Sequence, residues 1–165
     1  MITVLMTVEG ALANLPPWAT DDMLYRSPPS PIGQMLYRLF IDHKDRVILL
    51  SRNPNSVYVN QWLTREGYTS PYHIVKTKPP VDPYDEWLKG RFTEALSEGW
   101  RQPVIFDNDP AIIFLAHRSG LGISLLAEPD RVLTMRSRPA WDDLVSSIEA
   151  AHMRKAEQEV QDGNS

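Results

Sequence analysis

Short apolar runs alternate with stretches of helical period along this chain, and that alternation restricts its possible folds more than any other feature. Residues 2–6, 46–50 and 104–106 are rich in Val, Ile and Leu, which is typical of buried strands. Shorter runs at 72–75 and 123–126 predict two more strands. Helical patterns fill the intervals, at about 31–42, 57–66, 83–98 and 110–119. In the first of these helices, five apolar residues are predicted to form the buried face: Ile32, Met35, Leu36, Leu39 and Phe40.

This order of elements predicts an α/β fold. Apolar strands that alternate with helices favour a mostly parallel, doubly wound sheet covered on both faces, which is a three-layer α/β/α sandwich. The length of 165 residues suits one domain, which we place at residues 1–160 with a polar tail at 161–165. A last helix is expected at about 141–161. The Pro-rich stretch 15–31 is interpreted as an ordered loop within the domain, too short for more than a minimal cap.

Composition excludes several classes of function. The chain has no cysteine, so thiol catalysis, zinc–thiolate sites and disulfides are ruled out. Its 17 basic and 21 acidic residues are scattered without a basic stripe, which argues against a dedicated nucleic-acid-binding module. No stretch has the about 20 apolar residues of a membrane helix, so we expect a cytoplasmic protein without membrane contact.

Polar residues that suit phosphate chemistry follow the predicted strands. The carboxyl ends of parallel strands meet at one edge of the sheet, where ligands bind in open α/β folds. Acids, a hydroxyl and a lysine gathered there would make a site for a phosphate and a magnesium ion. The residues at the strand ends are Thr7, Glu9, Gly10, Ser51, Arg52, Asp107, Asn108 and Asp109, and Lys78 and Lys89 precede the predicted strand at 104–106.

Three segments resemble motifs of the haloacid-dehalogenase-like (HAD-like) hydrolases. Residues 4–12, VLMTVEGAL, resemble the first motif, an apolar strand followed by Asp-x-Asp-Gly-Thr-Leu. Residues 47–52 resemble the second motif, a strand ending in Ser or Thr, and residues 104–109 the fourth, a strand ending in acids. Within the superfamily, the chain is most similar to the phosphatase domain of polynucleotide kinases and to phage-type phosphatases. The resemblance spans about residues 2–126.

The resemblance implies a role for each of these positions. In active members, an aspartate attacks phosphorus, and the acid two residues later protonates the leaving group and then activates water. Carried over, Thr7 occupies the nucleophile position, Glu9 the acid/base position and Ser51 the phosphate-binding position. The phosphate-binding lysine corresponds to Lys89, with Lys78 as the alternative. The magnesium ligands correspond to Glu9, Asp107, Asn108 and Asp109.

Two departures from the family pattern indicate that catalysis is impaired. Thr7 is neutral where the family has an aspartate, and its hydroxyl is neither a ready nucleophile nor a strong ligand for a hard cation. Asn108 removes a second negative charge. We therefore expect weakened magnesium binding and a catalytically impaired protein that acts in binding or assembly.

Alternatives remain open at this point. The chain is alternatively an active magnesium-dependent phosphohydrolase acting on a nucleotide or a nucleic-acid 3′-phosphate end, or a structural protein whose Pro-rich loop contacts a protein partner. Thr7 and Glu9 are alternatively ordinary strand-end residues, and Asp107 and Asp109 helix caps. Of the tryptophans, Trp18 is the one expected near the site, because it lies in the loop after the first strand.

Overall fold

The computed structural model describes residues 1–98 and 101–125. Residues Met1–Leu126 form one compact unit. The helix expected at about 141–161 and the tail at 161–165 lie outside the described residues. The predicted single domain over residues 1–160 therefore stays a prediction.

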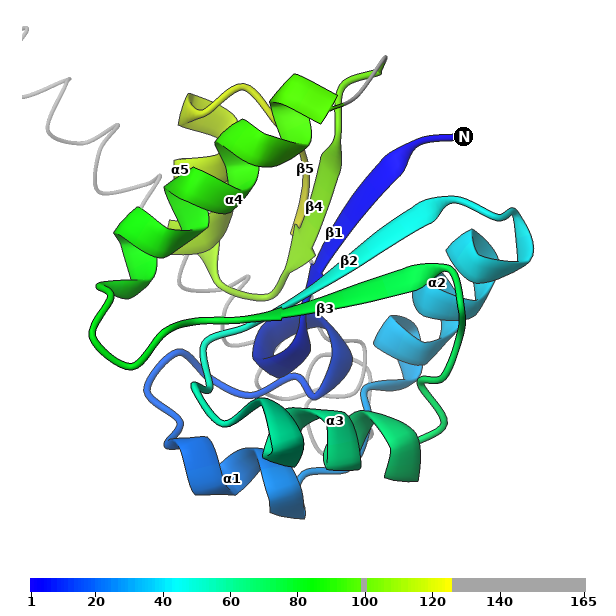
Figure 1. Cartoon of the computed structure of the whole chain (residues 1–165), viewed down its shortest axis with the longest axis vertical. Helices are drawn as coiled ribbons and strands as arrows, with labels where there is room; N and C mark the ends of the chain where they lie inside the picture. Colours follow the sequence, from blue (N-terminus) through cyan, green and yellow to red (C-terminus); the bar gives the residue numbers. More distant parts are fainter. Residues whose placement is uncertain (99–100, 126–165) are drawn as a thin grey trace, which may run out of the picture. The chain divides into compact units, whose positions relative to one another are not determined.

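Five parallel strands form the sheet, and their order matches a doubly wound fold (Figure 1). The strands are β1 (Thr3–Thr7), β2 (Arg46–Ser51), β3 (His73–Thr77), β4 (Val104–Asp107) and β5 (Gly122–Leu125), in the order β3-β2-β1-β4-β5. The chain winds outward from β1 to β3 and then crosses back to β4, so the order reverses between β1 and β4. That reversal leaves a crevice beyond the carboxyl ends of these two strands.

Helices cover both faces of the sheet, as the sequence predicts (Figure 1). The first layer contains a π-helical turn, η1 (Val8–Leu12), and the helices α1 (Asp21–Arg26), α2 (Pro31–Asp42) and α3 (Ser56–Arg65). The second layer contains α4 (Tyr84–Glu98) and α5 (Pro110–Arg118).

The buried side chains of the strands alternate between two cores. Val4 and Met6 of β1 point into the core that also contains Trp62 of α3. Leu5, between them in the sequence, points into the other core, where it packs with Phe92 of α4 and other residues of the second layer. The two layers thus bury opposite faces of the same strands, which confirms the α/β fold class.

Helix α2 begins where the sequence predicts, and its buried face agrees with the prediction in part. Ile32, Leu36 and Phe40 are half-buried, and the last two pack against the core. Ser30 Oγ accepts a hydrogen bond from the Gly33 amide at 3.3 Å, and Pro31 occupies the first turn. Met35 and Leu39, predicted to be buried, are 59% and 46% exposed. The reason lies at Gly33, where a Cβ atom would stand 2.1 Å from the carbonyl oxygen of Ala11. Only glycine permits the helix to approach the π-helical turn this closely.

The Pro-rich stretch 15–31 contains a short helix, so our interpretation of it as loop throughout is wrong in part. Helix α1 occupies the interval between Trp18 and Ser27, which has no proline. Asp21 and Asp22 lie in its first turn, where acidic side chains interact favourably with the helix dipole.

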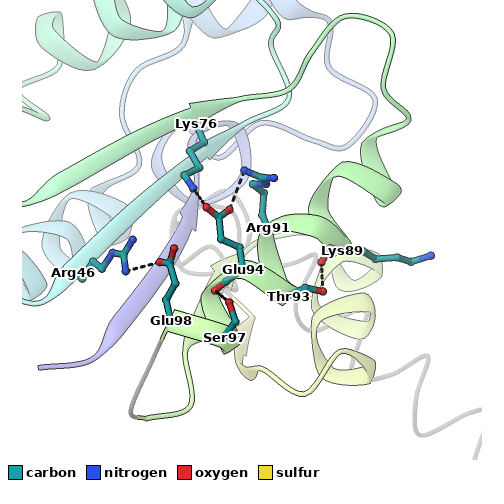
Figure 2. Close-up of polar contacts among 8 residues, drawn as sticks. All are labelled: Arg46, Lys76, Lys89, Arg91, Thr93, Glu94, Ser97 and Glu98. Atoms are coloured by element: carbon teal, nitrogen blue, oxygen red, sulfur yellow. Dashed lines mark hydrogen bonds and ion pairs between the residues drawn. The ribbon is translucent and has the colours of Figure 1, made fainter.

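Ion pairs tie α4 to the edge of the sheet that contains β2 and β3 (Figure 2). Arg46 of β2 lies 2.6 Å from Glu98. Lys76 of β3 lies 2.5 Å from Glu94, which Arg91 approaches from the other side at 2.9 Å. These side chains are partly exposed, so each pair stabilises the fold by at most about 1 kcal/mol. They orient a helix whose buried side already packs in the core.

Candidate functional site

Thr7 and Asp107 meet at the crevice where the strand order reverses. Thr7 is the last residue of β1 and Asp107 the last of β4, its neighbour. The Thr7 hydroxyl donates a hydrogen bond to Asp107 Oδ2 and accepts one from the Ala11 amide at 3.2 Å. Both side chains are almost completely buried. The predicted nucleophile position and the predicted metal position therefore contact each other directly.

The π-helical turn η1 brings the backbone after β1 against this pair. The Ala13 amide donates to the Val8 carbonyl at 2.8 Å, which closes the wide turn. Inside it, a Cβ atom at Gly10 would lie 2.6 Å from Asp107 Oδ1 and 2.7 Å from Thr7 Oγ1. Such distances are too short for any side chain. The position of Gly10 is therefore set by contact with the hydrogen-bonded pair.

A second acid–hydroxyl pair lies beside the first. The Ser51 hydroxyl, at the end of β2, donates to Glu9 Oε1 at 2.5 Å, and the Arg52 amide donates to Glu9 Oε2 at 3.3 Å. Ser51 Oγ also accepts from the Asn53 amide at 3.1 Å. Glu9 is 6% exposed and Ser51 fully buried. Both oxygens of Glu9 thus have protein donors.

Burial raises the pKa of both acids. The pKa of Asp107 rises to about 6, mainly because burial penalises the charged carboxylate, while the hydrogen bond from Thr7 opposes the rise. Burial likewise raises the pKa of Glu9, against the hydrogen bond from Ser51 and the charge of Arg52. Two neighbouring acids that both resist ionisation make a less negative site than their formal charges suggest.

Little space remains above the two acids. The cavity that Glu9, Asp107 and Gly10 line has a volume of about 10 Å³, close to the minimum for one water molecule. Arg52 and Tyr84 are among the residues that close it. In this conformation, the site excludes a phosphate group.

Neither predicted lysine lines this cavity. The Lys78 amide donates to the Ser51 carbonyl at 2.9 Å, but its ammonium group binds the carbonyl oxygens of Pro79 and Asp82 at 2.8 and 2.9 Å. Lys89 pairs with Glu86 at 2.8 Å on the outer side of α4. The structure thus brings together Thr7, Glu9, Ser51 and Asp107 without a lysine ammonium group.

Asn108 and Asp109 both support the backbone around the site. The Asn108 amide group donates to Asn14 Oδ1 at 2.8 Å and to the Leu15 carbonyl at 3.1 Å, which fastens the loop after η1. Asp109 is the N-cap of α5, with Oδ1 accepting from the Ala111 amide at 2.9 Å. Both lie at the edge of the cavity, and both have contacts typical of structural residues.

The donor arrangement does not fit a magnesium ion. Within residues 1–98 and 101–125, no three acidic or histidine side chains stand close enough to share a metal. The direct hydrogen bond between Thr7 and Asp107 leaves no gap for a cation between them. Asp107 Oδ1 also accepts from the Asp109 amide at 2.7 Å, which uses one of its two lone pairs. Magnesium therefore stays a prediction from the resemblance.

Arg52, the last residue of the second predicted motif, and Tyr84, which no motif marks, also line the cavity. The Arg52 guanidinium donates to the carbonyl oxygens of Pro17 at 2.7 Å, Ala19 at 2.8 Å and Pro16 at 3.4 Å. Its position directly after Ser51 was the only available signal. Burial raises the pKa of Tyr84 well above its usual value, and the charges of Glu9 and Asp107 add to the rise. No pattern marks Tyr84, because it reaches the site from the start of α4.

Comparison of the chain with protein-family models, with curated proteins and with solved structures finds no match. Among the described residues, no helix has the length and apolar character needed to cross a membrane.

Proposed function

We propose that this chain is a catalytically impaired member of the HAD-like phosphatase superfamily that acts in binding or assembly. The observation that carries the proposal is the hydrogen bond between Thr7 and Asp107 at the reversal of strand order. In an active member, the first position would carry an anion and a cation would balance it. Here a neutral hydroxyl satisfies the acid directly, so the pair needs no cation.

The surroundings of this pair support the same conclusion. Both oxygens of Glu9 already accept hydrogen bonds, so it is poorly placed to serve as a mobile acid and base. The raised pKa of Asp107, about 6, reduces its negative charge below that pH. The small cavity leaves no room for substrate in this conformation. Each feature stabilises a closed polar core and weakens phosphoryl transfer.

A phosphatase assay tests the proposal. The full chain is incubated with magnesium and either p-nitrophenyl phosphate or an oligonucleotide with a 3′-phosphate. We expect no turnover above that of the Asp107→Ala variant. Appreciable turnover by the natural sequence that disappears in Glu9→Ala or Asp107→Ala would refute the impaired-enzyme proposal.

A pair of Thr7 variants tests the physical reason. Thr7→Asp places a second carboxylate against Asp107, which favours a divalent cation because oxygen anions supply most of its binding energy. Thr7→Asn has the same shape without the charge. Magnesium should raise the melting temperature of Thr7→Asp and leave those of Thr7→Asn and the natural sequence unchanged. A similar rise in the natural sequence would show that Thr7 does not prevent cation binding.

An active phosphohydrolase on a nucleotide or a nucleic-acid 3′-phosphate end is the second proposal. What favours it is the pKa of Asp107, since a value of about 6 suits a general base near neutral pH. In that mechanism, Asp107 takes a proton from a water that attacks phosphorus directly, while the bond from phosphorus to the ester oxygen breaks and the alcohol leaves with a proton from solvent. The turnover assay described above separates this proposal from the first one.

A protein partner at the Pro-rich loop is the third proposal. Trp18, in this loop before α1, is 76% exposed, and Arg52 holds the adjacent backbone. Exposed tryptophans on rigid loops are frequent anchors of protein interfaces. Self-association measured by sedimentation should decrease in Trp18→Ser. Unchanged assembly in that variant would count against the loop as an interface between copies of the chain.

A further inference from the structure

Strand β3 forms one edge of the sheet, and its outer side has no backbone partner among the described residues (Figure 1). The Val47 amide donates to the Tyr72 carbonyl at 3.4 Å, and the Lys78 amide donates to the Ser51 carbonyl at 2.9 Å. Even-numbered residues along β3 thus direct their backbone groups towards β2. Because successive residues of a strand alternate, the odd-numbered residues direct theirs outward. These residues are His73, Val75 and Thr77.

The outer edge of β3 lacks the features that usually prevent strand pairing. Proteins protect exposed edges with prolines, bulges or charged side chains. Residues 73–77 contain no proline, and they pair with β2 in continuous register without a bulge. Their one lysine, Lys76, pairs with Glu94 of α4 at 2.5 Å, so its charge is compensated within the chain (Figure 2). The strand itself therefore does not oppose the addition of another strand.

Two large apolar side chains are exposed at this edge. Ile74 is 43% exposed, and Tyr72, just before the strand, is 47% exposed. Val75 packs against the core of the first layer, whereas Lys76 reaches α4 on the opposite face. Ile74 shares the face of Lys76, because side chains two residues apart lie on the same side of a strand. Exposed apolar surface thus lies directly beside unpaired backbone groups, a combination that favours strand pairing.

We propose that β3 pairs in antiparallel orientation with β3 of a second copy of the chain, about a two-fold axis at Ile74. In this register, His73 of each copy lies opposite Val75 of the other, and the two residues exchange both backbone hydrogen bonds. The pairing uses only backbone groups that point outward from β2. A two-fold contact is closed, so assembly stops at a dimer.

The side chains that this register brings together are complementary. Ile74 lies opposite Ile74 of the other copy, in a pair whose Cα atoms are about 4.5 Å apart. Tyr72 lies opposite Lys76 of the other copy, where its ring packs against the methylene groups of the lysine. An axis at Val75 would also match the backbone groups, but it would place Lys76 opposite each Ile74. The apolar contact therefore selects the axis at Ile74.

Disulfide cross-linking of single-cysteine variants tests the register, because the natural chain has no cysteine. Ile74→Cys brings two thiols together on Cα atoms about 4.5 Å apart, within the usual range for a disulfide. Diamide is the oxidant and takes up the two electrons and two protons that the thiols lose. This variant should form a covalent dimer that dithiothreitol reverses.

Two further cysteine variants are the controls. In Lys76→Cys, the two thiols would be about 13 Å apart along the paired strands, too far for a disulfide. Ile123→Cys is the matched control at the other edge of the sheet, because Ile123 lies on β5 and is 44% exposed. Both controls should stay monomeric on a denaturing gel under the conditions that cross-link Ile74→Cys.

Sedimentation velocity of the full chain measures the dimer without a cross-link. The natural sequence should dimerise with a Kd in the micromolar range. Ile74→Lys should weaken the dimer by about tenfold or more, because it places two like charges directly opposite each other. Ile123→Lys makes the same change on β5 and should leave the Kd unchanged. The melting temperatures of the two variants verify that both are folded.

Several results would overturn the proposal. One is a natural sequence that stays monomeric at millimolar concentration, and another is an equal Kd for Ile74→Lys and the natural sequence. Cross-linking of Lys76→Cys or Ile123→Cys as fast as that of Ile74→Cys would contradict the register. A dimer that is weakened by Trp18→Ser and not by Ile74→Lys would assign the assembly to the Pro-rich loop instead. The pairing uses no residue of the acid site, so none of these results decides the phosphatase assay.

Discussion

At the scale of single residues, Gly10 has no space for a side chain. Its Cα carries no side chain, and Thr7 Oγ1 and Asp107 Oδ1 fill the space that a Cβ atom would need. Asp107 is fixed by its own hydrogen bonds to Thr7 and to the Asp109 amide, so it cannot move aside without losing them. The contact links the backbone of η1 directly to the acid.

Gly10→Ala should therefore destabilise the protein. We expect a loss of about 1–3 kcal/mol in the free energy of unfolding, the usual cost of forcing an extra methyl group into a packed site. Gly90→Ala is the control, since a Cβ atom there meets nothing within 4 Å. Because Gly90 lies in the middle of α4, Gly90→Ala should raise the free energy of unfolding by about 0.5–1 kcal/mol. Urea denaturation measures both variants, and equal effects would show that the contact at Gly10 is unimportant.

The site residues also show which positions can be located from the sequence and which cannot. Thr7, Glu9, Ser51 and Asp107 were found because strand ends meet at one edge of a parallel sheet, and topology alone brings them together. The lysines were not located correctly, because a side chain on a helix or a turn takes its direction from local packing. Lys78 binds the carbonyl oxygens of its own turn, and no spacing rule reveals that.

At the scale of elements, the loop between η1 and α1 depends on side chains from distant strands. Arg52, after β2, binds three of its carbonyl oxygens, and Asn108, after β4, binds Asn14 and Leu15. Two of the eight residues of this loop, Pro16 and Pro17, have no amide donor, which leaves its backbone fewer donors for these carbonyl oxygens. The loop is therefore ordered by the site that it covers.

Arg52→Gln should loosen this loop. The shorter, uncharged side chain cannot span the carbonyls of Pro17 and Ala19, so the peptide bond after Trp18 should become a better substrate for chymotrypsin. We expect cleavage there to accelerate by about tenfold or more, since hydrogen bonds from a charged group contribute about 1.5–3 kcal/mol each. Arg38→Gln, at an exposed position on α2, should not change the rate. Mass spectrometry of the first fragments identifies the bond, and equal rates in both variants would contradict this role of Arg52.

The bounds of the helices and strands agree with the prediction where the sequence contains a clear helix cap or a clear apolar run. Ser30 and Pro31 set the start of α2, and the run 46–50 matches β2 within one residue. The exposure of Met35 and Leu39 on α2 was not predictable, because it depends on contact with the π-helical turn. No periodicity in five residues distinguishes such a turn from an ordinary one. The short helix α1 was missed because the flanking prolines dominated the interpretation.

At the scale of the whole molecule, the two acid–hydroxyl pairs fasten the three central strands at their carboxyl edge. Thr7 and Asp107 join β1 to β4, and Glu9 and Ser51 join the turn after β1 to β2. Because unfolding exposes both acids to water, their raised pKa values couple global stability to pH. The folded protein holds protons that the unfolded chain releases, so stability should fall as pH rises through this range.

Asp107 makes this coupling measurable. Its pKa rises from 3.8 to about 6, so its stabilising contribution is complete below about pH 4 and is lost as pH rises through about 6. The shift corresponds to about 3 kcal/mol at most. Asp107→Asn should flatten the decline in unfolding free energy between about pH 4 and 7, measured by urea denaturation at each pH. Asp22→Asn is a control of opposite sign, since a hydrogen bond from Thr20 lowers the pKa of Asp22 and its contribution is lost as pH falls. An equally steep decline in the unfolding free energy of Asp107→Asn and of the natural sequence would contradict this role of Asp107. It would mean that Asp107 does not hold its proton in the folded protein. Thr7 would then face a charged carboxylate able to recruit a cation.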